Sequence, residues 1–357
     1  MPRARPAVGG VRAMLLRERA EVKVEGLPRR YPELPWREDP LEPVDLPAPE
    51  PGGGQVLLRV EACGACYTDL DIVEGRVGCK LPLILGHQIV GRVVEAGPGA
   101  EGLVGARVGV AWIAWACGTC KFCGRGLENL CERFRATGCD VDGGYAEYAI
   151  AYADFVHPLP EGVEAERLAP LLCAGAVGYR ALRLADPPDG GRLGLFGFGS
   201  SAHIVIQLAR ALRPSLEVYV FTRSAEHRRL ALELGADWAG HPSEDPPAKL
   251  DCAIDFTPVG ETVARAMELL DRGGRLVINA IRKQTPVVLD YARHMWEERE
   301  VRSVANVSRE DVRGLIRLAA RSPPRISVQR YRLEEANRAL RDLKAARGGG
   351  SPGIVPT

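Results

Sequence analysis

The feature that most limits the possible fold is a stretch, from about residue 165 to 300, in which apolar strand patterns alternate with helical patterns. Inside it, an apolar run at 192–196 leads into a glycine-rich turn at 197–199 and then into a helical pattern over 201–212. Such alternation is typical of a parallel sheet wound with helices on both faces. The sequence therefore predicts an α/β fold with a doubly wound domain.

The glycine-rich turn has the spacing G-x-G-x-x-A of a dinucleotide-binding turn, between a strand and a helix. We expect Gly197 to make the tight turn and Gly199 to let a pyrophosphate approach the helix N-terminus. Ala202 would allow the helix to pack closely on the sheet, and Ser200 and Ser201 are candidate cofactor contacts. The alternative is a glycine-rich turn that binds no ligand.

The end of the next strand indicates which dinucleotide would bind. An enzyme that uses NAD usually carries Asp or Glu there, to accept from the ribose 2′-hydroxyl. Here the strand ends with Thr222, Arg223 and Ser224. Because an arginine beside small hydroxyl residues suits a 2′-phosphate, we expect a preference for NADP(H) over NAD(H). The alternative is an arginine that stacks on adenine.

Residues from about 11 to 160 are predicted to be all β-structure, and those after about 300 to add a strand at 301–307 and helices at 310–320 and 333–344. Short apolar runs at 56–62, 89–95 and 107–111 are separated by Gly and Pro, as in a barrel-like β fold. A length of 357 residues fits two domains. Residues 1–10 are expected to be a disordered leader, and the Gly-Ser-Pro tail at 348–352 to be flexible or turn-forming.

Charge and hydropathy exclude two classes of partner. The 47 Lys and Arg residues nearly balance 46 Asp and Glu residues, so no basic nucleic-acid surface is indicated. The longest apolar runs are too short to span a bilayer. The chain opens without an apolar secretory segment, which predicts a cytoplasmic protein with reduced thiols.

Four of the ten cysteines form a compact cluster with metal-ligand spacing: Cys117, Cys120, Cys123 and Cys131. Four thiolates close a tetrahedral shell around Zn²⁺ and leave no open position, which predicts a structural metal. Gly118, Gly124 and Gly126 would let the backbone turn tightly between them. An iron–sulfur cluster is the alternative, since four thiolates serve both.

Three further residues are individually unremarkable: Cys66, His87 and Cys173. An isolated cysteine before an apolar run is usually a core residue, and an isolated Gly-His is usually a turn. Spacing alone does not join residues more than a hundred positions apart.

In their order along the chain, these motifs resemble the zinc-dependent medium-chain alcohol dehydrogenases, most of all the bacterial and archaeal members near the cinnamyl alcohol dehydrogenases. The resemblance covers about residues 12–345. Its motifs are Cys66-Tyr67-Thr68-Asp69, Gly86-His87-Gln88, the four-cysteine cluster, Leu172-Cys173-Ala174-Gly175 and the Gly197 turn.

The resemblance implies a GroES-like β-barrel catalytic domain at 11–160 and 300–357, and a Rossmann cofactor domain at 161–299. It implies two zinc ions per chain, the catalytic one held by Cys66, His87 and Cys173 with a fourth position left open. Thr68 would take the proton of the alcohol, although it is alternatively a simple helix cap. Asp69 would orient the imidazole of His87. Cys63, Cys79, Cys139 and Cys252 are left over and are interpreted as ordinary thiols.

Four positions depart from the family pattern. Gln88 replaces a frequent Glu and cannot act as an alternative anionic zinc ligand. Asp71 replaces the His that often ends the proton relay. Either this carboxylate accepts a proton or bonds a ribose hydroxyl, or the relay stops at Thr68 and solvent. Tyr67 and Val177 replace residues that approach the pyrophosphate and the nicotinamide in many relatives. The resemblance also places Ala280, like Val177, at the cofactor.

The leading hypothesis is a zinc enzyme that interconverts primary alcohols and aldehydes by hydride transfer to or from NADP(H). Trp112 and Trp115 are either pocket walls for an apolar or aromatic substrate tail or ordinary packing. An NAD-dependent or polyol-type dehydrogenase and a non-catalytic zinc-binding relative remain the alternatives. Relatives pair through their cofactor domains, which implies a homodimer or homotetramer.

Overall fold

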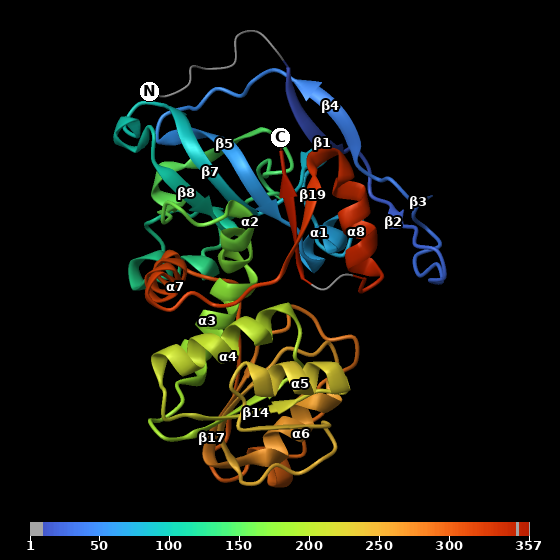
Figure 1. Ribbon diagram of the computed structural model, residues 1–357, viewed down its shortest axis with the longest axis vertical. Coiled ribbons are helices and arrows are strands. Elements are labelled where there is room, and N and C mark those ends of the chain that lie inside the picture. Colours follow the sequence, from blue (N-terminus) through green and yellow to red (C-terminus); the bar gives the residue numbers. More distant parts are fainter. Residues whose placement is uncertain (1–9, 348–349, 357) are drawn as a thin grey trace. The chain divides into compact units, whose positions relative to one another are not determined.

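A computed structural model describes residues 10–347 and 350–356 (Figure 1). The chain divides into two compact units, which are described separately. The first contains the described residues up to Cys173 together with 308–312 and those from Ile326 onward. The second contains Ala174–Val307 and Arg313–Arg325. The expected leader lies outside the described residues, except for Gly10, which is exposed.

The first unit is built on a mainly antiparallel seven-stranded sheet in the order β12-β8-β7-β5-β20-β19, with β11 paired to β5. Register shifts between β5 and β7 mark bulges, which bend and twist a sheet. The strands of this sheet are β5 (Gln55–Gly64), β7 (Gln88–Ala96), β8 (Arg107–Val110), β11 (Tyr148–Tyr152), β12 (Val156–Pro158), β19 (Val328–Arg332) and β20 (Ser351–Val355).

Smaller elements complete this unit. A three-stranded sheet has the order β4-β1-β6, and two pairs are formed by β2 with β3 and by β9 with β10. Their bounds are β1 (Val11–Leu16), β2 (Glu21–Val22), β3 (Trp36–Arg37), β4 (Glu42–Leu46), β6 (Leu83–Ile84), β9 (Ile113–Trp115) and β10 (Arg135–Ala136). The α-helices are α1 (Tyr67–Val73), α2 (Ala165–Leu168) and α8 (Ala336–Lys344).

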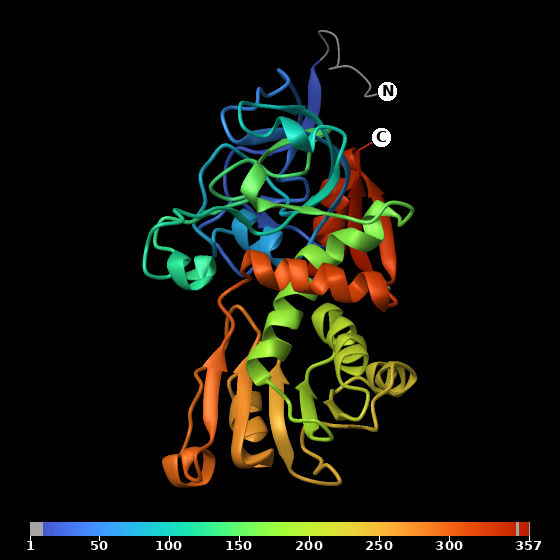
Figure 2. The ribbon, with the colours of Figure 1, turned by 90° about the vertical axis from the view of Figure 1, so that its left-hand side faces the viewer.

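The second unit is a six-stranded, fully parallel sheet in the order β15-β14-β13-β16-β17-β18 (Figure 2). Strand β13 has β14 on one side and β16 on the other, so the strand order reverses there, as at the ligand crevice of doubly wound folds. The strands are β13 (Arg192–Phe196), β14 (Glu217–Phe221), β15 (Trp238–Gly240), β16 (Leu250–Asp255), β17 (Leu270–Ile278) and β18 (Glu300–Ser303).

The helices of this unit follow the predicted alternation. They are α3 (Ala174–Ala185), α4 (Ser200–Leu212), α5 (Ala225–Glu233) and α6 (Glu261–Leu269); α7 (Arg309–Arg321) begins in the first unit. Ser224 caps α5 by accepting from the backbone N–H of His227, and Gly235 follows the helix at φ +103°. The predicted doubly wound parallel sheet and the predicted β-rich part of the chain are therefore both present.

The position of the unit boundaries differs from the expected one. The first unit runs to Cys173 rather than to 160, and the second continues to Val307 rather than ending at 299. The physical reason at the second boundary is that β18 pairs with β17 in parallel register and so belongs to the cofactor-type sheet.

The expectation of a flexible or turn-forming tail at 348–352 is wrong for its last two residues, while 348 and 349 lie outside the described residues. Ser351 and Pro352 begin β20, which pairs with β19 and β5. Ile354 of this strand is fully buried, so apolar burial holds the tail in the sheet.

The leftover cysteines were only partly predicted. Cys63 and Cys252 are buried free thiols, as expected. Cys79 and Cys139 were expected to be ordinary thiols, but they form a disulfide across 60 residues of chain. The fold brings two distant loops together at this point, and sequence spacing carries no sign of that.

Among the described residues, no single helix is long and apolar enough to cross a membrane. Two consecutive helical segments, Ala165–Leu172 and Ala174–Ala185, reach that length and composition only together.

Candidate functional site

The structure brings Cys66, His87 and Cys173 together in the first unit. The Nε2 atom of His87 lies 3.5 Å from the Sγ atom of Cys66 and 3.4 Å from that of Cys173. A tetrahedral zinc ion, with bonds of about 2.3 Å to sulfur and about 2.0 Å to nitrogen, separates its ligand atoms by roughly 3.5–3.8 Å. The three donors therefore fit one Zn²⁺ and leave its fourth position open.

Cys66 stands at the N-cap of α1, and the first turn of this helix positions it. Its Sγ atom accepts from the backbone N–H of Thr68 at 3.4 Å. Asp69 completes a capping box, because its Oδ2 atom accepts from the backbone N–H of Cys66 at 2.8 Å. The cap thus ties the metal ligand to the carboxylate three residues later.

The other oxygen of Asp69 faces His87. Its Oδ1 atom lies 3.6 Å from the Nδ1 atom of His87, and both side chains are buried. Neither atom has another hydrogen-bond partner within the described part of the chain. Because the 3.6 Å separation exceeds that of an N–H···O hydrogen bond, the contact is electrostatic in this structure. The carboxylate faces the imidazole nitrogen that is not directed at the cysteines, and its orienting role stays a prediction.

Tight packing before His87 demands a glycine. Gly86 has φ +97°, and a Cβ atom there would lie 2.5 Å from the ring of Tyr145 and 2.7 Å from the Sγ atom of Cys63. The imidazole of His87 packs edge-to-face against the ring of Trp112, with centroids 5.2 Å apart. The backbone before this residue and its ring are therefore both closely packed.

Cys173 reaches the site through the 3₁₀ segment η5 (Ala169–Leu172), which packs on β7 and β8. Leu172 covers Gly109 of β8 so closely that a Cβ atom there would be 2.7 Å from Leu172.

The electrostatic environment of Cys66 also favours metal binding. A hydrogen bond from Cys173 lowers the pKa of the Cys66 thiol to about 5; burial opposes this, and His87 reinforces it. The thiolate is the form that binds metals.

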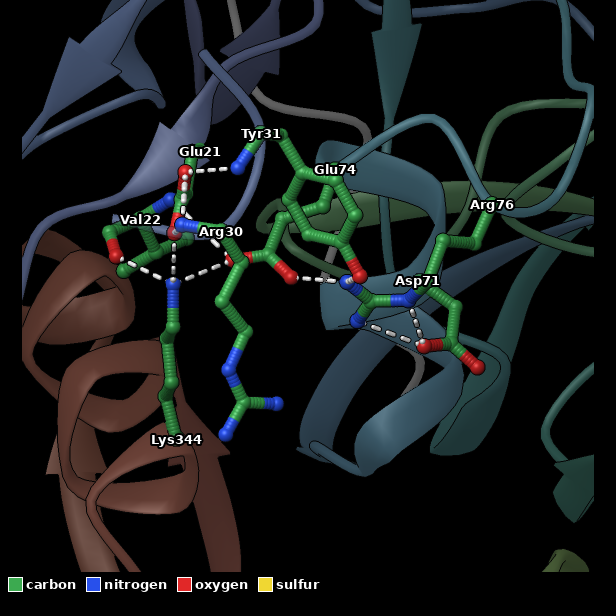
Figure 3. Close-up of polar contacts among 8 residues, drawn as sticks. All are labelled: Glu21, Val22, Arg30, Tyr31, Asp71, Glu74, Arg76 and Lys344. Atoms are coloured by element: carbon green, nitrogen blue, oxygen red, sulfur yellow. Dashed lines mark hydrogen bonds and ion pairs between the residues drawn. The ribbon is translucent and has the colours of Figure 1, made fainter. Parts of the chain in front are cut away.

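The two remaining residues predicted to be catalytic lie on α1. Thr68 is buried, and its hydroxyl has no hydrogen-bond partner among the described residues, so it remains available to a substrate. Asp71 is engaged: its Oδ1 atom is 2.8 Å from Nε and 2.7 Å from Nη2 of Arg76 (Figure 3). A relay that ends on this carboxylate would therefore compete with the guanidinium.

Arg76 and Lys344 organise a larger network around this carboxylate. Arg76 donates to Glu74 and, at 2.9 Å, to the hydroxyl of Tyr31. Lys344, on α8, donates to Glu74 at 2.7 Å and to Glu21 at 3.2 Å. Figure 3 shows these groups joined in one chain of contacts from α8 to α1. The network thus braces the helix that carries Thr68 and Asp69.

The four-cysteine cluster is also assembled. All four Sγ atoms lie within 4.8 Å of one another, and those of Cys117 and Cys123 are 3.9 Å apart. Backbone N–H groups point at two of the sulfurs, as around metal thiolates. Gly118 and Gly126 adopt positive φ, whereas Gly124 does not. The donor set fits a closed zinc site.

The glycine-rich turn of the second unit has the predicted form. Gly197 has φ +84°, and its N–H donates to the carbonyl of Phe221 at 2.8 Å. Gly199 is the N-cap of α4, and a Cβ atom there would meet nothing within 4 Å. Ala202 is fully buried against the sheet. The open space at Gly199 suits a phosphate at the helix N-terminus.

The two serines after this turn differ. Ser200 is exposed and free to face a cofactor. Ser201 was also predicted to be a cofactor contact, but its hydroxyl donates to the carbonyl of Ala174 at 2.7 Å. The Ser201 hydroxyl therefore links α4 to the first residue of α3, and its contact with a cofactor stays a prediction.

At the end of β14, Thr222 is buried and Ser224 is occupied as the cap of α5. Arg223 is exposed and makes no ion pair with any described residue. Sequence reasoning missed Arg228, whose guanidinium donates to the carbonyls of Thr222 at 2.8 Å and Arg223 at 2.9 Å. The sequence feature that could have identified Arg228 is its position one helical turn after the N-cap residue Ser224.

The last two candidate cofactor residues belong to the same unit. Val177 lies half-buried on α3. Ala280 follows β17, and its N–H donates to the carbonyl of Asp255 at 3.3 Å. Trp112 and Trp115 both pack against the apolar cluster that includes the four cysteines. Trp112 also contacts the ring of His87, whereas the guanidinium of Arg135 lies over the ring of Trp115.

Comparison with known proteins agrees with this site. The family model described as alcohol dehydrogenase GroES-like domain matches residues 52–161, and that described as zinc-binding dehydrogenase matches residues 202–321. A Mycobacterium tuberculosis protein named "Probable alcohol dehydrogenase AdhA" is 45% identical over 324 residues, which cover 89% of this chain and 93% of the relative.

Solved structures share the fold. A zinc-binding dehydrogenase from Sinorhizobium meliloti 1021 bound to NADP superposes with a TM-score of 0.83 at 27% identity, covering 97% of this chain and 99% of that one. A cinnamyl alcohol dehydrogenase from Sorghum bicolor superposes with a TM-score of 0.81 at 25% identity, covering 97% of each chain. The resemblance drawn from the motifs is confirmed, and the chain belongs to the zinc-binding medium-chain alcohol dehydrogenase family.

Proposed function

We propose that this alcohol dehydrogenase interconverts primary alcohols and aldehydes by hydride transfer to or from NADP(H). The observation that carries the proposal is the three-donor set of Cys66, His87 and Cys173, next to the unpaired hydroxyl of Thr68. Zinc held there would supply Lewis acidity toward an alcohol or carbonyl oxygen. A second zinc, held by the four-cysteine cluster, would stabilise the fold.

Thr68 is the residue proposed to receive the proton of the alcohol. Its hydroxyl is uncommitted, whereas Asp71 is bound to Arg76. We therefore propose that the relay within this unit ends at Thr68 and that Asp71 acts with Arg76 as a brace of α1. Asp69 keeps its predicted role, because it faces the Nδ1 atom of His87.

The proposed preference for NADP(H) rests on the end of β14. No carboxylate stands there to repel a 2′-phosphate, and the exposed guanidinium of Arg223 is free of described partners. The relative from Sinorhizobium meliloti bound to NADP supports the choice. We expect Arg223→Ala to lower kcat/KM for NADP⁺ at least about tenfold and to leave that for NAD⁺ nearly unchanged. A tenfold preference of the unaltered chain for NAD⁺ would refute the proposal.

The proposal also includes a homodimer or homotetramer. Large apolar side chains are exposed in the second unit at Ile281, Val288, Tyr291 and Trp296. The rings of Tyr291 and Trp296 are in contact, and exposed apolar side chains that gather in one patch are typical of an interface between subunits. Sedimentation of the intact chain measures the assembly directly.

The main experiment compares zinc content with aldehyde-dependent NADPH oxidation in two cysteine variants. Cys66→Ala should lose one of two zinc ions per chain and nearly all turnover. Cys252→Ala, a buried cysteine of the other unit, should keep both. Benzyl, cinnamyl, short aliphatic and polyol substrates separate the proposal from a polyol enzyme. Equal turnover in Cys66→Ala and the unaltered chain would remove zinc catalysis.

A further inference from the structure

A buried ion pair lies at the carboxyl edge of the parallel sheet and has no part in the assignments above. Asp255 is the last residue of β16, in register with Phe196, the last residue of β13. Its side chain is fully buried, and its Oδ2 atom accepts from the ammonium group of Lys283. Lys283 lies on the segment after β17, with 14% of its side chain exposed.

Thr257 connects this ion pair to the glycine-rich turn through hydrogen bonds and packing. The Oδ1 atom of Asp255 accepts from the hydroxyl of Thr257 at 2.7 Å and from its N–H at 3.2 Å. Thr257 packs on Gly197, since a Cβ atom there would lie 3.0 Å from the Thr257 methyl group. Lys283 also donates to the carbonyl of Thr257 at 2.6 Å. The cluster therefore lies directly beside the point where the strand order reverses.

One N–H bond of the Lys283 ammonium group has no acceptor among the described residues. An ammonium group has three N–H bonds, and the described residues accept two of those of Lys283. The Asp255 carboxylate is fully buried and already accepts three hydrogen bonds, two at Oδ1 and one at Oδ2, so the ammonium group of Lys283 is the more accessible polar group at this edge. The unused polar group at this edge is thus a donor, and its partial exposure makes it accessible to a ligand.

The sheet topology says which part of a dinucleotide lies nearest. A doubly wound sheet binds one mononucleotide half on each side of the reversal point. The end of β14, with Thr222 and Arg223, serves the adenosine half, so the ends of β16 and β17 serve the other. We propose that Lys283 is a cofactor-binding residue whose third N–H donates to a hydroxyl oxygen of the nicotinamide-side ribose. This inference rests on the proposed function, since it presumes a nicotinamide dinucleotide.

Calorimetric titrations with three probes test this contact on the intact chain. ADP carries only the adenosine half with its pyrophosphate, ADP-ribose adds the second ribose, and NADP⁺ is the complete cofactor. In Lys283→Met we expect the Kd of ADP-ribose and of NADP⁺ to rise about tenfold or more, because a charge-assisted hydrogen bond is lost. The Kd of ADP should change less than twofold.

Two further variants keep the test interpretable. Lys283→Met alone leaves a buried carboxylate without its cation, which endangers folding. The double variant Asp255→Asn with Lys283→Met removes both charges and should show the same selective loss. Lys249→Met is the matched control, because Lys249 precedes β16 at the opposite edge of the sheet and donates to the carbonyl of Glu268. It should bind all three probes as the unaltered chain does.

The outcomes separate this inference from the proposed function. Unchanged ADP-ribose binding in both Lys283 variants would overturn the contact. An equal loss for ADP and ADP-ribose would also overturn it, because Lys283 would then only hold the glycine-rich turn. Failure of the unaltered chain to bind NADP⁺, NAD⁺ and ADP-ribose would refute the dinucleotide itself and the inference with it.

Discussion

Replacement of Gly86 by alanine tests whether backbone conformation and packing together place the imidazole of His87. The alanine would have to adopt φ +97°, a left-handed conformation that costs an L-residue about 1–2 kcal/mol of folding free energy. It would also lie 2.5 Å from the ring of the fully buried Tyr145 and 2.7 Å from the Sγ atom of Cys63. Overpacking of this kind costs about 1–3 kcal/mol, so we expect a total loss of about 2–5 kcal/mol.

The matched control is Gly162→Ala in the same unit. Gly162 has φ +77°, but a Cβ atom there would meet nothing within 4 Å. It isolates the conformational penalty and should cost about 1–2 kcal/mol. Urea unfolding measures both free energies. Zinc content adds a local measurement, since Gly86→Ala should lower metal retention at the Cys66 site and Gly162→Ala should not.

Equal losses of unfolding free energy and equal zinc content in the two variants would refute a packing role for Gly86. Equal losses would mean that the packing around Gly86 relaxes freely. In that case, the close contacts with Tyr145 and Cys63 would have no part in holding His87.

Three other predictions concern stability and the metal. Replacing Cys79 and Cys139 together by serine should lower the free energy of unfolding by about 4 kcal/mol in non-reducing buffer, and reductant should remove the difference. Burial opposes ionisation of Glu21, but N–H groups of Arg30 and Tyr31 and the ammonium of Lys344 lower its pKa overall. Its stabilising effect is therefore present above pH 4.5 and lost on acidification below it, so Glu21→Gln should flatten the acid side of a stability–pH profile. Asp69→Asn should weaken zinc binding at the Cys66 site about 10–100-fold, as a competitive chelator titration will show.

Local spacing accounts for much of what the sequence predicted. The four-cysteine cluster lies within one short segment, Cys117 to Cys131, so its metal ligands could be predicted from their spacing in the sequence. The strand, turn and helix around Gly197 could be predicted in the same way, because the conformation of each depends mainly on residues nearby in the sequence. The cap at Ser224 likewise needs only the following turn of helix.

Side-chain partners were much less predictable. Asp71 was a candidate relay residue from its spacing after Cys66, but the fold turns Arg76 onto it. Ser201 has the position of a phosphate contact, but α3 offers it a carbonyl. Such choices depend on which groups compete for one polar atom in space. A sequence motif names the residue at a position but not the other groups that compete to bond with it in the folded chain.

The sequence alone determined the chemical types available: seven metal-binding side chains, a dinucleotide-type turn and an arginine in place of an acid after β14. Only the tertiary structure decided that Cys66, His87 and Cys173 meet within hydrogen-bonding distance, and that Lys283 ends beside the turn of Gly197. The physical reason is that long-range contacts depend on strand register and on packing as close as that of Gly86 against Tyr145. Residue spacing along the chain does not encode these quantities locally.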